Sequence, residues 1–209
     1  DALAAQHRGD LAAAAPLFHK ILEHDPEQAD ALHGLGLFDY EQGRPAEALQ
    51  KMQRALLYRP DAPDILNNMG TVYMSLGQLT EALAVYARSL ELKPNSISFN
   101  CNYGLALTRA GRPQDAADLM KRMLAAKADL VPALNILANA ERALGQFQNS
   151  LLHYQQVLQL TPDDPEAYYN VGVALQDLWR MNESIAYYDQ AITRRADVSR
   201  YHVNRGAAL

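Results

Sequence analysis

The sequence predicts an all-α fold, a solenoid built from tandem helix-turn-helix repeats. Three observations predict it. Several kinds of residue return every 34 positions, each period holds two amphipathic stretches, and glycine or proline separates those stretches. A fixed period of 20 to 50 residues is the usual sequence sign of a repeat architecture.

The period is visible in five registers that keep one spacing without insertion or deletion. The first is Gly36, Gly70, Gly104, Gly172 and Gly206, with Ala2 and Ala138 at the two remaining places. The other registers are Gly9, Gly43, Gly77, Gly111 and Gly145; Ala14, Ala48, Ala82, Ala116, Ser150 and Ser184; Phe18, Met52, Tyr86, Met120, Tyr154 and Tyr188; and Pro26, Pro60, Pro94 and Pro162. Agreement among five registers indicates a repeated structural unit.

The first helix of a repeat is clearest in the unit 63–96, where we expect it over residues 63–76. Leu66, Met69 and Tyr73 form an apolar stripe at spacings of three and four residues. Gly77 follows and supplies the tight turn, because glycine adopts positive φ at no steric cost.

The second helix is expected over residues 79–92, where Leu79, Leu83, Tyr86 and Leu90 repeat the helical spacing. In two other units Pro45 and Pro113 stand where this helix begins, a position that tolerates a missing N–H. Pro94 follows the end of the helix and stops its propagation.

Gly70 lies inside the first helix, where glycine costs about 1 kcal/mol relative to alanine. Two helices joined by a short turn must cross closely, and a side chain at the crossing would push them apart. We therefore expect Gly70 and Ala82 to give the clearance, with Tyr86 filling the space beside them.

The unit boundaries follow from this register. Full repeats cover residues 29–62, 63–96, 97–130, 131–164 and 165–198, preceded by a partial repeat over 1–28 and followed by another over 199–209. Together they form one array. Both ends cut through a repeat and no polar capping element is visible, so we expect the chain to be part of a longer protein.

The pattern resembles the tetratricopeptide repeat family. The family motif W-x2-L-G-x2-Y, A-x3-F, P corresponds to LNNMGTVY, ALAVY and KP within residues 66–94. The resemblance covers the whole chain and implies a right-handed superhelix whose first helices face a concave groove. Asp39 and Glu141 depart from it at the usual aromatic position, and Trp179 replaces a turn glycine.

Asparagines gather in the first helices, which hold eight of the 11 in the chain. Asparagine is a weak helix former, but its amide both donates and accepts hydrogen bonds, so it can pair with the backbone of an extended peptide. At the sixth position of a repeat, Asn68, Asn102, Asn170 and Asn204 resemble the asparagine ladder of O-linked N-acetylglucosamine transferases, which Gly34 and Ile136 interrupt.

The candidate peptide-binding residues occupy the positions that the resemblance turns toward the groove. They are Asn67, Asn68, Asn102, Asn135, Asn139, Tyr169, Asn170, Asn204, Arg109 and Arg142. The competing interpretation is that these asparagines bond neighbouring helices to one another. Tyr86, Tyr154 and Tyr188 are expected in the core.

A carboxylate clamp, known from chaperone-binding members of the family, is the second candidate site. Its best match is Asn135, Asn139, Asn170, Arg200 and Asn204. Only Asn139 and Asn170 agree outright, and the lysine and final arginine are missing. Because a free carboxylate needs that charge, we do not expect a clamp.

Composition and motifs exclude other classes of function. The net charge is −5 and no Lys/Arg block occurs, so no nucleic acid is expected as a partner. The longest apolar run, residues 11–18, is too short for membrane insertion. The six histidines lack zinc-site spacing, and no catalytic or cofactor motif is present. The single cysteine, Cys101, is compatible with a reducing, cytoplasmic location.

The sequence therefore predicts a protein-interaction scaffold, not an enzyme, whose concave groove binds an extended peptide or a partner helix. Two alternatives stay open. The array could be the substrate-recruiting arm of a larger enzyme such as an O-linked glycosyltransferase, or it could form a homo-oligomer through its open terminal helices.

Overall fold

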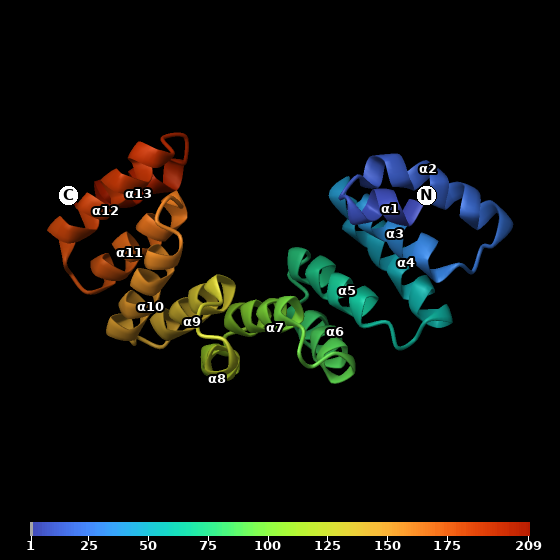
Figure 1. Ribbon diagram of the computed structural model, residues 1–209, viewed down its shortest axis with the longest axis horizontal. Coiled ribbons are helices and arrows are strands. Elements are labelled where there is room, and N and C mark those ends of the chain that lie inside the picture. Colours follow the sequence, from blue (N-terminus) through green and yellow to red (C-terminus); the bar gives the residue numbers. More distant parts are fainter. Residues whose placement is uncertain (1) are drawn as a thin grey trace. The chain divides into compact units, whose positions relative to one another are not determined.

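The structure is a computed structural model that describes residues 2–209, except for the side chain of His7. Those residues form thirteen α-helices and no β-strand, as the sequence predicts. The chain divides into two compact units, residues 1–106 and 107–209 (Figure 1). Each unit is described by itself.

In the first unit, each of the first six helices packs against its neighbour along the chain. Its helices are α1 (Ala2–His7), α2 (Leu11–His24), α3 (Ala29–Glu41), α4 (Pro45–Tyr58), α5 (Pro63–Ser75), α6 (Leu79–Leu92) and most of α7 (Ile97–Arg109). The predicted helix over 63–76 ends one residue early at Ser75, and the predicted helix over 79–92 is correct.

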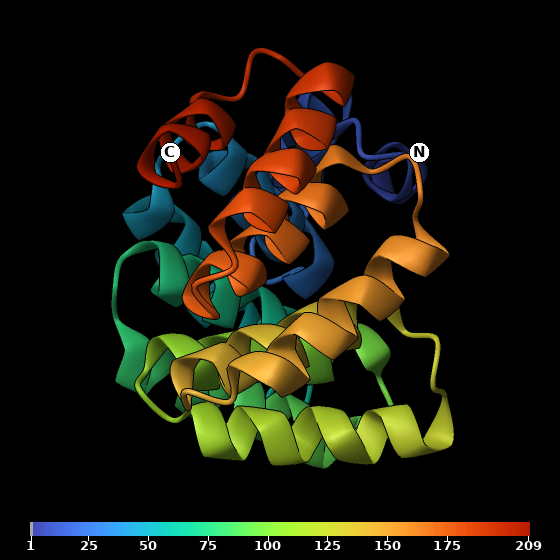
Figure 2. The same ribbon diagram turned by 90° about the vertical axis from the view of Figure 1, so that its left-hand side faces the viewer.

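The second unit begins within α7, and each of its six later helices packs against its neighbour along the chain. Its helices are α8 (Pro113–Ala126), α9 (Val131–Ala143), α10 (Phe147–Leu160), α11 (Pro165–Asp177), α12 (Met181–Arg194) and α13 (Ser199–Ala207). Figure 2 brings its C-terminal helices to the front, and α11 and α12 pack as one helix pair.

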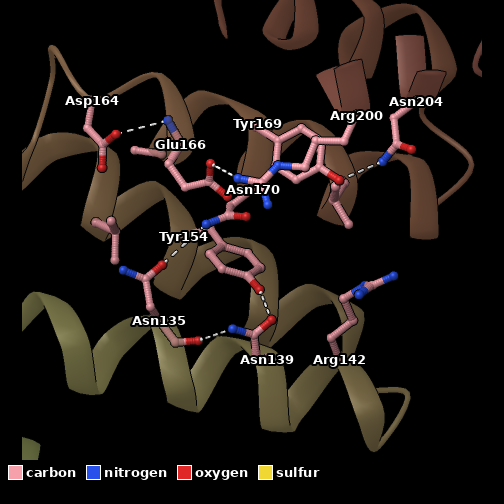
Figure 3. A pocket seen from close by; sticks show the side chains of 13 residues that line it. Asn135, Asn139, Arg142, Tyr154, Asp164, Glu166, Tyr169, Asn170, Arg200 and Asn204 are labelled. Atoms are coloured by element: carbon pink, nitrogen blue, oxygen red, sulfur yellow. Dashed lines mark hydrogen bonds and ion pairs between the residues drawn. The ribbon is translucent and has the colours of Figure 1, made fainter. Parts of the chain in front are cut away.

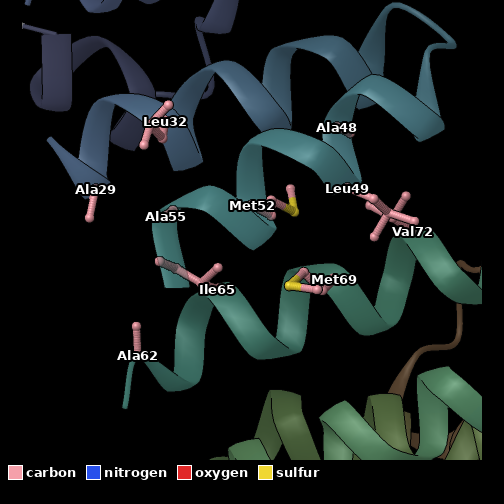
Figure 4. Packing of buried hydrophobic residues seen from close by; sticks show 10 residues of the cluster. All are labelled: Ala29, Leu32, Ala48, Leu49, Met52, Ala55, Ala62, Ile65, Met69 and Val72. Atoms are coloured by element: carbon pink, nitrogen blue, oxygen red, sulfur yellow. The ribbon is translucent and has the colours of Figure 1, made fainter. Parts of the chain in front are cut away.

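The core of the first unit lies where α3, α4 and α5 meet. Small and bulky side chains interlock there, as Figure 4 shows for Leu32, Met52, Ile65 and Met69, all less than 5% exposed. Ala48 and Ala55 allow α4 to approach both neighbours closely. Each first helix therefore packs against second helices on both sides, which leaves its remaining face for other contacts.

The close crossing predicted at Gly70 is present. A Cβ atom added to Gly70 would lie 2.5 Å from a ring carbon of Tyr86. Gly172 and Tyr188 repeat this relation in the second unit, at 2.6 Å. The backbone of the first helix thus lies directly on the tyrosine ring, and no side chain fits between them.

Glycine is needed at position 34 for a different reason. A Cβ atom there would overlap the ring of Phe18, which comes from the second helix of the preceding, partial repeat. Phe18 is 1% exposed and packs with Ala2, Ala31 and Leu35. The ring occupies the place of a sixth-position side chain, which explains why the asparagine series is interrupted at Gly34.

Each acidic departure is paired with a basic side chain of the following helix. The buried carboxylate of Asp39 accepts hydrogen bonds from Arg44 Nε at 3.1 Å and from Lys51. The buried carboxylate of Glu141 lies 2.7 Å from Nδ1 of His153, which stands 12 residues further on, like Lys51 from Asp39. A polar contact with a basic side chain therefore replaces the packing made at this position by Tyr73, Leu107 and Leu175 in the other repeats.

We expect Gly70→Leu to lower the free energy of unfolding by at least about 2 kcal/mol, because the new side chain cannot avoid the Tyr86 ring. A single groove asparagine changed to alanine should lower it less, by about 1 kcal/mol for one hydrogen bond. Urea unfolding measures both.

Gly206→Leu is the matched control, because Gly206 holds the same position in its repeat and a Cβ there meets nothing within 4 Å. It should leave stability unchanged or raise it slightly, since leucine is the better helix former. Equal losses for the two glycine variants would contradict the close-crossing explanation.

We expect the stability contributed by Asp39 to depend on pH. Burial opposes the charge of Asp39, but the hydrogen bonds from Lys51 and Arg44 outweigh it and lower the carboxyl pKa below its ordinary 3.8. The contribution is therefore complete above pH 3.8 and is lost as the pH falls through the lowered pKa. Asp39→Asn should cost about 1.5 to 3 kcal/mol at neutral pH and much less in acid. A pH-independent difference in chemical denaturation would refute this.

Candidate functional site

Side-chain hydrogen bonds join successive first helices through a repeated pair of positions. The sixth-position asparagine donates its amide N–H to the fifth-position side chain of the preceding repeat, 35 residues earlier. The four pairs are Asn68 to His33 at 2.9 Å, Asn102 to Asn67 at 3.1 Å, Asn170 to Asn135 at 3.4 Å and Asn204 to Tyr169 at 2.9 Å. We call Asn68, Asn102, Asn170 and Asn204 the ladder asparagines.

These bonds fix the orientation of each ladder amide. Nδ2 points to the neighbouring helix, and within residues 2–209 no group donates a hydrogen bond to the four Oδ1 atoms. All four side chains are partly exposed. The ladder asparagines therefore bond neighbouring helices, as the competing interpretation held, and still offer one acceptor each to a further molecule.

A hollow of about 390 Å³ opens in the second unit on the face formed by α9, α11 and α13 (Figure 3). Its lining is mostly polar. The residues are Asn135, Asn139, Arg142, Tyr154, Val157, Asp164, Glu166, Ala167, Tyr169, Asn170, Val173, Arg200 and Asn204. Three successive repeats contribute to it, so its shape depends on their stacking.

A tyrosine of the core supports the floor of this hollow. Tyr154 is 2% exposed, but its hydroxyl donates a hydrogen bond to Asn139 Oδ1 at 2.8 Å. Burial raises the pKa of the Tyr154 hydroxyl, which keeps it protonated and able to donate. Asn139 in turn donates to the Asn135 carbonyl at 2.9 Å. Asn139 is thus held on both sides of its amide (Figure 3).

An aromatic and cationic stack forms one wall. The Tyr169 ring lies 5.0 Å from the Tyr201 ring and 5.8 Å from the Tyr188 ring. The guanidinium carbon of Arg200 lies 5.1 Å from the centroid of Tyr169, within the range of a cation–π contact. This stack holds Tyr169 in place beside Asn170 and Asn204.

The positive charges at the hollow are already paired with carboxylates. Arg142 Nε contacts Asp177, and Arg200 contacts Glu166, which also accepts a hydrogen bond from the Tyr201 hydroxyl at 2.9 Å. Burial opposes the charge of Arg142, but the contact with Asp177 outweighs it and raises the guanidinium pKa. The hollow therefore offers hydrogen-bonding groups and little net charge.

The structure brings six of the ten predicted site residues into this hollow: Asn135, Asn139, Arg142, Tyr169, Asn170 and Asn204. Asn67, Asn68 and Asn102 lie on α5 and α7 of the first unit, where they belong to the two ladder bonds of that unit. Arg109 is exposed in the last turn of α7 and does not line the hollow.

Sequence reasoning missed two contributors. Tyr154 was assigned to the core alone, although its hydroxyl reaches the hollow. The sequence signal was the pairing of a tyrosine with a polar ninth position, Tyr86 with Thr71 and Tyr154 with Asn139. In the structure the hydroxyl oxygens of Tyr86 and Thr71 also lie 3.2 Å apart. His33 is not among the predicted site residues, although it shares the fifth position of its repeat with Asn67 and Asn135, and the structure makes it the partner of Asn68.

Other kinds of site find little support. No described helix is long and apolar enough to cross a bilayer. No three described His, Cys, Asp or Glu side chains gather as a metal ion would require. The Cys101 thiol is buried, and burial raises its pKa, which opposes formation of the reactive thiolate.

Solved structures with this fold match the chain at low sequence identity. A tetratricopeptide repeat protein from Parabacteroides merdae aligns with 99% of this chain over 82% of its own length, with a TM-score of 0.86 and 21% identity. PilW, a type IV pilus biogenesis factor, covers 97% and 94%, with a TM-score of 0.84 and 19% identity. YrrB, described as a tetratricopeptide protein with an unusual peptide-binding site, covers 93% and 98%, with a TM-score of 0.69 and 20% identity.

Family models give the sequence-level match. The tetratricopeptide repeat model matches residues 2–56 and 137–200, and the model of the cytochrome c-type biogenesis protein H TPR domain matches residues 55–168. Neither describes a catalytic family. No curated protein matches the chain in sequence. Because each of the two models covers more than half of the chain, the chain belongs to the tetratricopeptide repeat family.

Proposed function

We propose that this chain is a protein-interaction scaffold that binds an extended peptide along the first helices within a unit, with the hollow lined by Asn135, Asn170 and Asn204 in the second unit as the main site. The observation that carries the proposal is the orientation of the ladder asparagines. One N–H of each amide is engaged between helices, and no described residue is recorded as a donor to the amide oxygens. Such oxygens suit the backbone N–H groups of a peptide.

The spacing of the ladder fits an extended chain. Packed helix axes lie on the order of 8–10 Å apart, and an extended peptide rises about 3.3 Å per residue. Each ladder oxygen would therefore meet the N–H of about every third peptide residue. Contacts of this kind depend on the peptide backbone, so the scaffold would accept varied sequences.

The hollow adds a preference for polar, weakly charged peptides. Arg142 and Arg200 are both paired with carboxylates, so a strongly charged ligand would have to separate an ion pair. Tyr169 offers an aromatic surface to an apolar side chain of the ligand. The peptide-binding site named in the description of YrrB supports peptide binding as a use of this fold. The recruiting-arm alternative remains a prediction from the sequence.

We expect a variant with alanine at Asn68, Asn102, Asn170 and Asn204 to lose binding to an array of unrelated short peptides while keeping its helical circular dichroism. It should also unfold at lower urea, because each residue gives up one inter-helix bond worth about 0.5 to 1.5 kcal/mol. Fluorescence anisotropy with peptides selected from the array measures the affinity.

The matched control replaces Asn95, Asn149 and Asn182 with alanine, since all three are exposed and lie outside the first helices. This control should bind as the wild type does. Unchanged peptide binding by the folded ladder variant would show that the ladder is structural only.

Backbone N-methylation of a bound peptide tests the direction of the contact. Methylation removes single N–H donors while the side chains stay the same. If the ladder oxygens accept from the peptide, methylation at about every third residue should weaken binding by roughly tenfold, and methylation between those residues should have little effect. Uniform tolerance of methylation would contradict the proposed mode of binding.

A further inference from the structure

Trp179 stands in the turn between α11 and α12, where the other described turns of this kind have glycine. Its φ is +60°, close to the +73° to +79° of Gly9, Gly43, Gly77, Gly111 and Gly145. The turn keeps the same hydrogen bonds, with Arg180 N donating to the Leu175 carbonyl as Gln146 N does to Glu141. A bulky residue therefore takes a backbone conformation that favours glycine.

The side chain of Trp179 does not offset this strain by packing within the unit. It is 83% exposed, and no described group hydrogen-bonds its indole. Trp179 is the only tryptophan of the sequence. A strained residue that contributes no internal packing points to a contact outside the unit.

A small hollow lies directly beside this turn. It holds about 360 Å³ and is lined by Gln148, Leu151, Leu152, Gln155, Leu178 and Arg180. Leu152 is 63% exposed. Leu178 and Arg180 are the two neighbours of Trp179 in sequence, so a projecting indole and an apolar depression lie on the same patch. None of these residues lines the larger hollow on the face formed by α9, α11 and α13.

We propose that this patch binds a second copy of the chain, with Trp179 of each copy inserted into the hollow of the other. A twofold interface joins a surface patch to itself, so it requires a projection and a matching depression side by side. This patch has both. A tryptophan side chain buries roughly 150 to 250 Å² of surface when it is bound, and such residues are typical anchors of protein interfaces.

The charges at the patch favour a second copy over a charged partner. Arg180 donates to Glu183 through Nε at 2.8 Å and Nη2 at 2.7 Å, and Gln148 and Gln155 are neutral. No unpaired charge of the lining would repel an identical patch. The patch is small, so we expect a reversible dimer that forms as the concentration rises.

The emission of the single tryptophan reports directly on this contact. In the wild type its maximum should move to shorter wavelength as the protein concentration increases, in step with dimer formation in sedimentation velocity. Trp179→Gly should weaken association by at least about tenfold, yet melt at the same or a higher temperature, since it restores the residue of the other turns.

A mixing experiment separates insertion into the hollow from simple stacking of two tryptophans. Leu152→Glu changes an exposed position of the hollow and keeps Trp179, whereas Trp179→Gly keeps the hollow and has no tryptophan. Adding the Trp179→Gly protein to Leu152→Glu should shift the emission of the latter to shorter wavelength. Adding more Leu152→Glu should not.

Three results would overturn the proposal. The first is a wild type that stays monomeric with a constant emission maximum, which would indicate that another protein occupies the patch. The second is a dimer that persists in folded Trp179→Gly, which would place self-association at a different surface, such as the terminal helices. The third is an emission maximum of Leu152→Glu that does not change when the tryptophan-free variant is added.

Discussion

The close crossing of helix pairs, present where Gly70 meets Tyr86 and Gly172 meets Tyr188, is the constraint on which the neighbouring contacts depend. Where a tyrosine ring lies on the glycine of the first helix, the ring sets the separation of the helix pair. That separation sets how the next repeat stacks. It brings the fifth position of one first helix beside the sixth position of the next, so that Asn102 reaches Asn67 and Asn204 reaches Tyr169.

Tyrosines of this register also connect the core to the candidate site. Tyr154 is buried along its ring, yet its hydroxyl holds Asn139 at the floor of the hollow. Tyr86 and Thr71 repeat this arrangement in the first unit. Packing and the proposed ligand contact would therefore be coupled. Each ladder asparagine donates an N–H to the neighbouring helix, and under the proposed function its oxygen accepts from a peptide, so the two interpretations of the sequence are compatible.

Much of the fold could be predicted from periodicity, because glycine, proline and apolar residues act locally. Gly77 indicates a turn whatever its distant neighbours are, and the apolar stripe of Leu66, Met69 and Tyr73 indicates a helix. The rest depends on contacts between distant residues. The register places Asn170 near the groove but does not say which amide atom is engaged, and nothing near Gly34 in sequence shows that Phe18 fills its place. Likewise the motif shows Asp39 and Glu141 only as departures, because their partners Lys51 and His153 lie 12 residues further along the chain.

The most direct test of the central claim is a crystal structure of the chain with a bound peptide selected from an array. The account predicts that backbone N–H groups of the peptide lie within hydrogen-bonding distance of Oδ1 of Asn170 and Asn204. The bonds from their Nδ2 atoms to Asn135 and Tyr169 should persist. A peptide bound elsewhere, or held only through its side chains while the ladder oxygens face water, would contradict it.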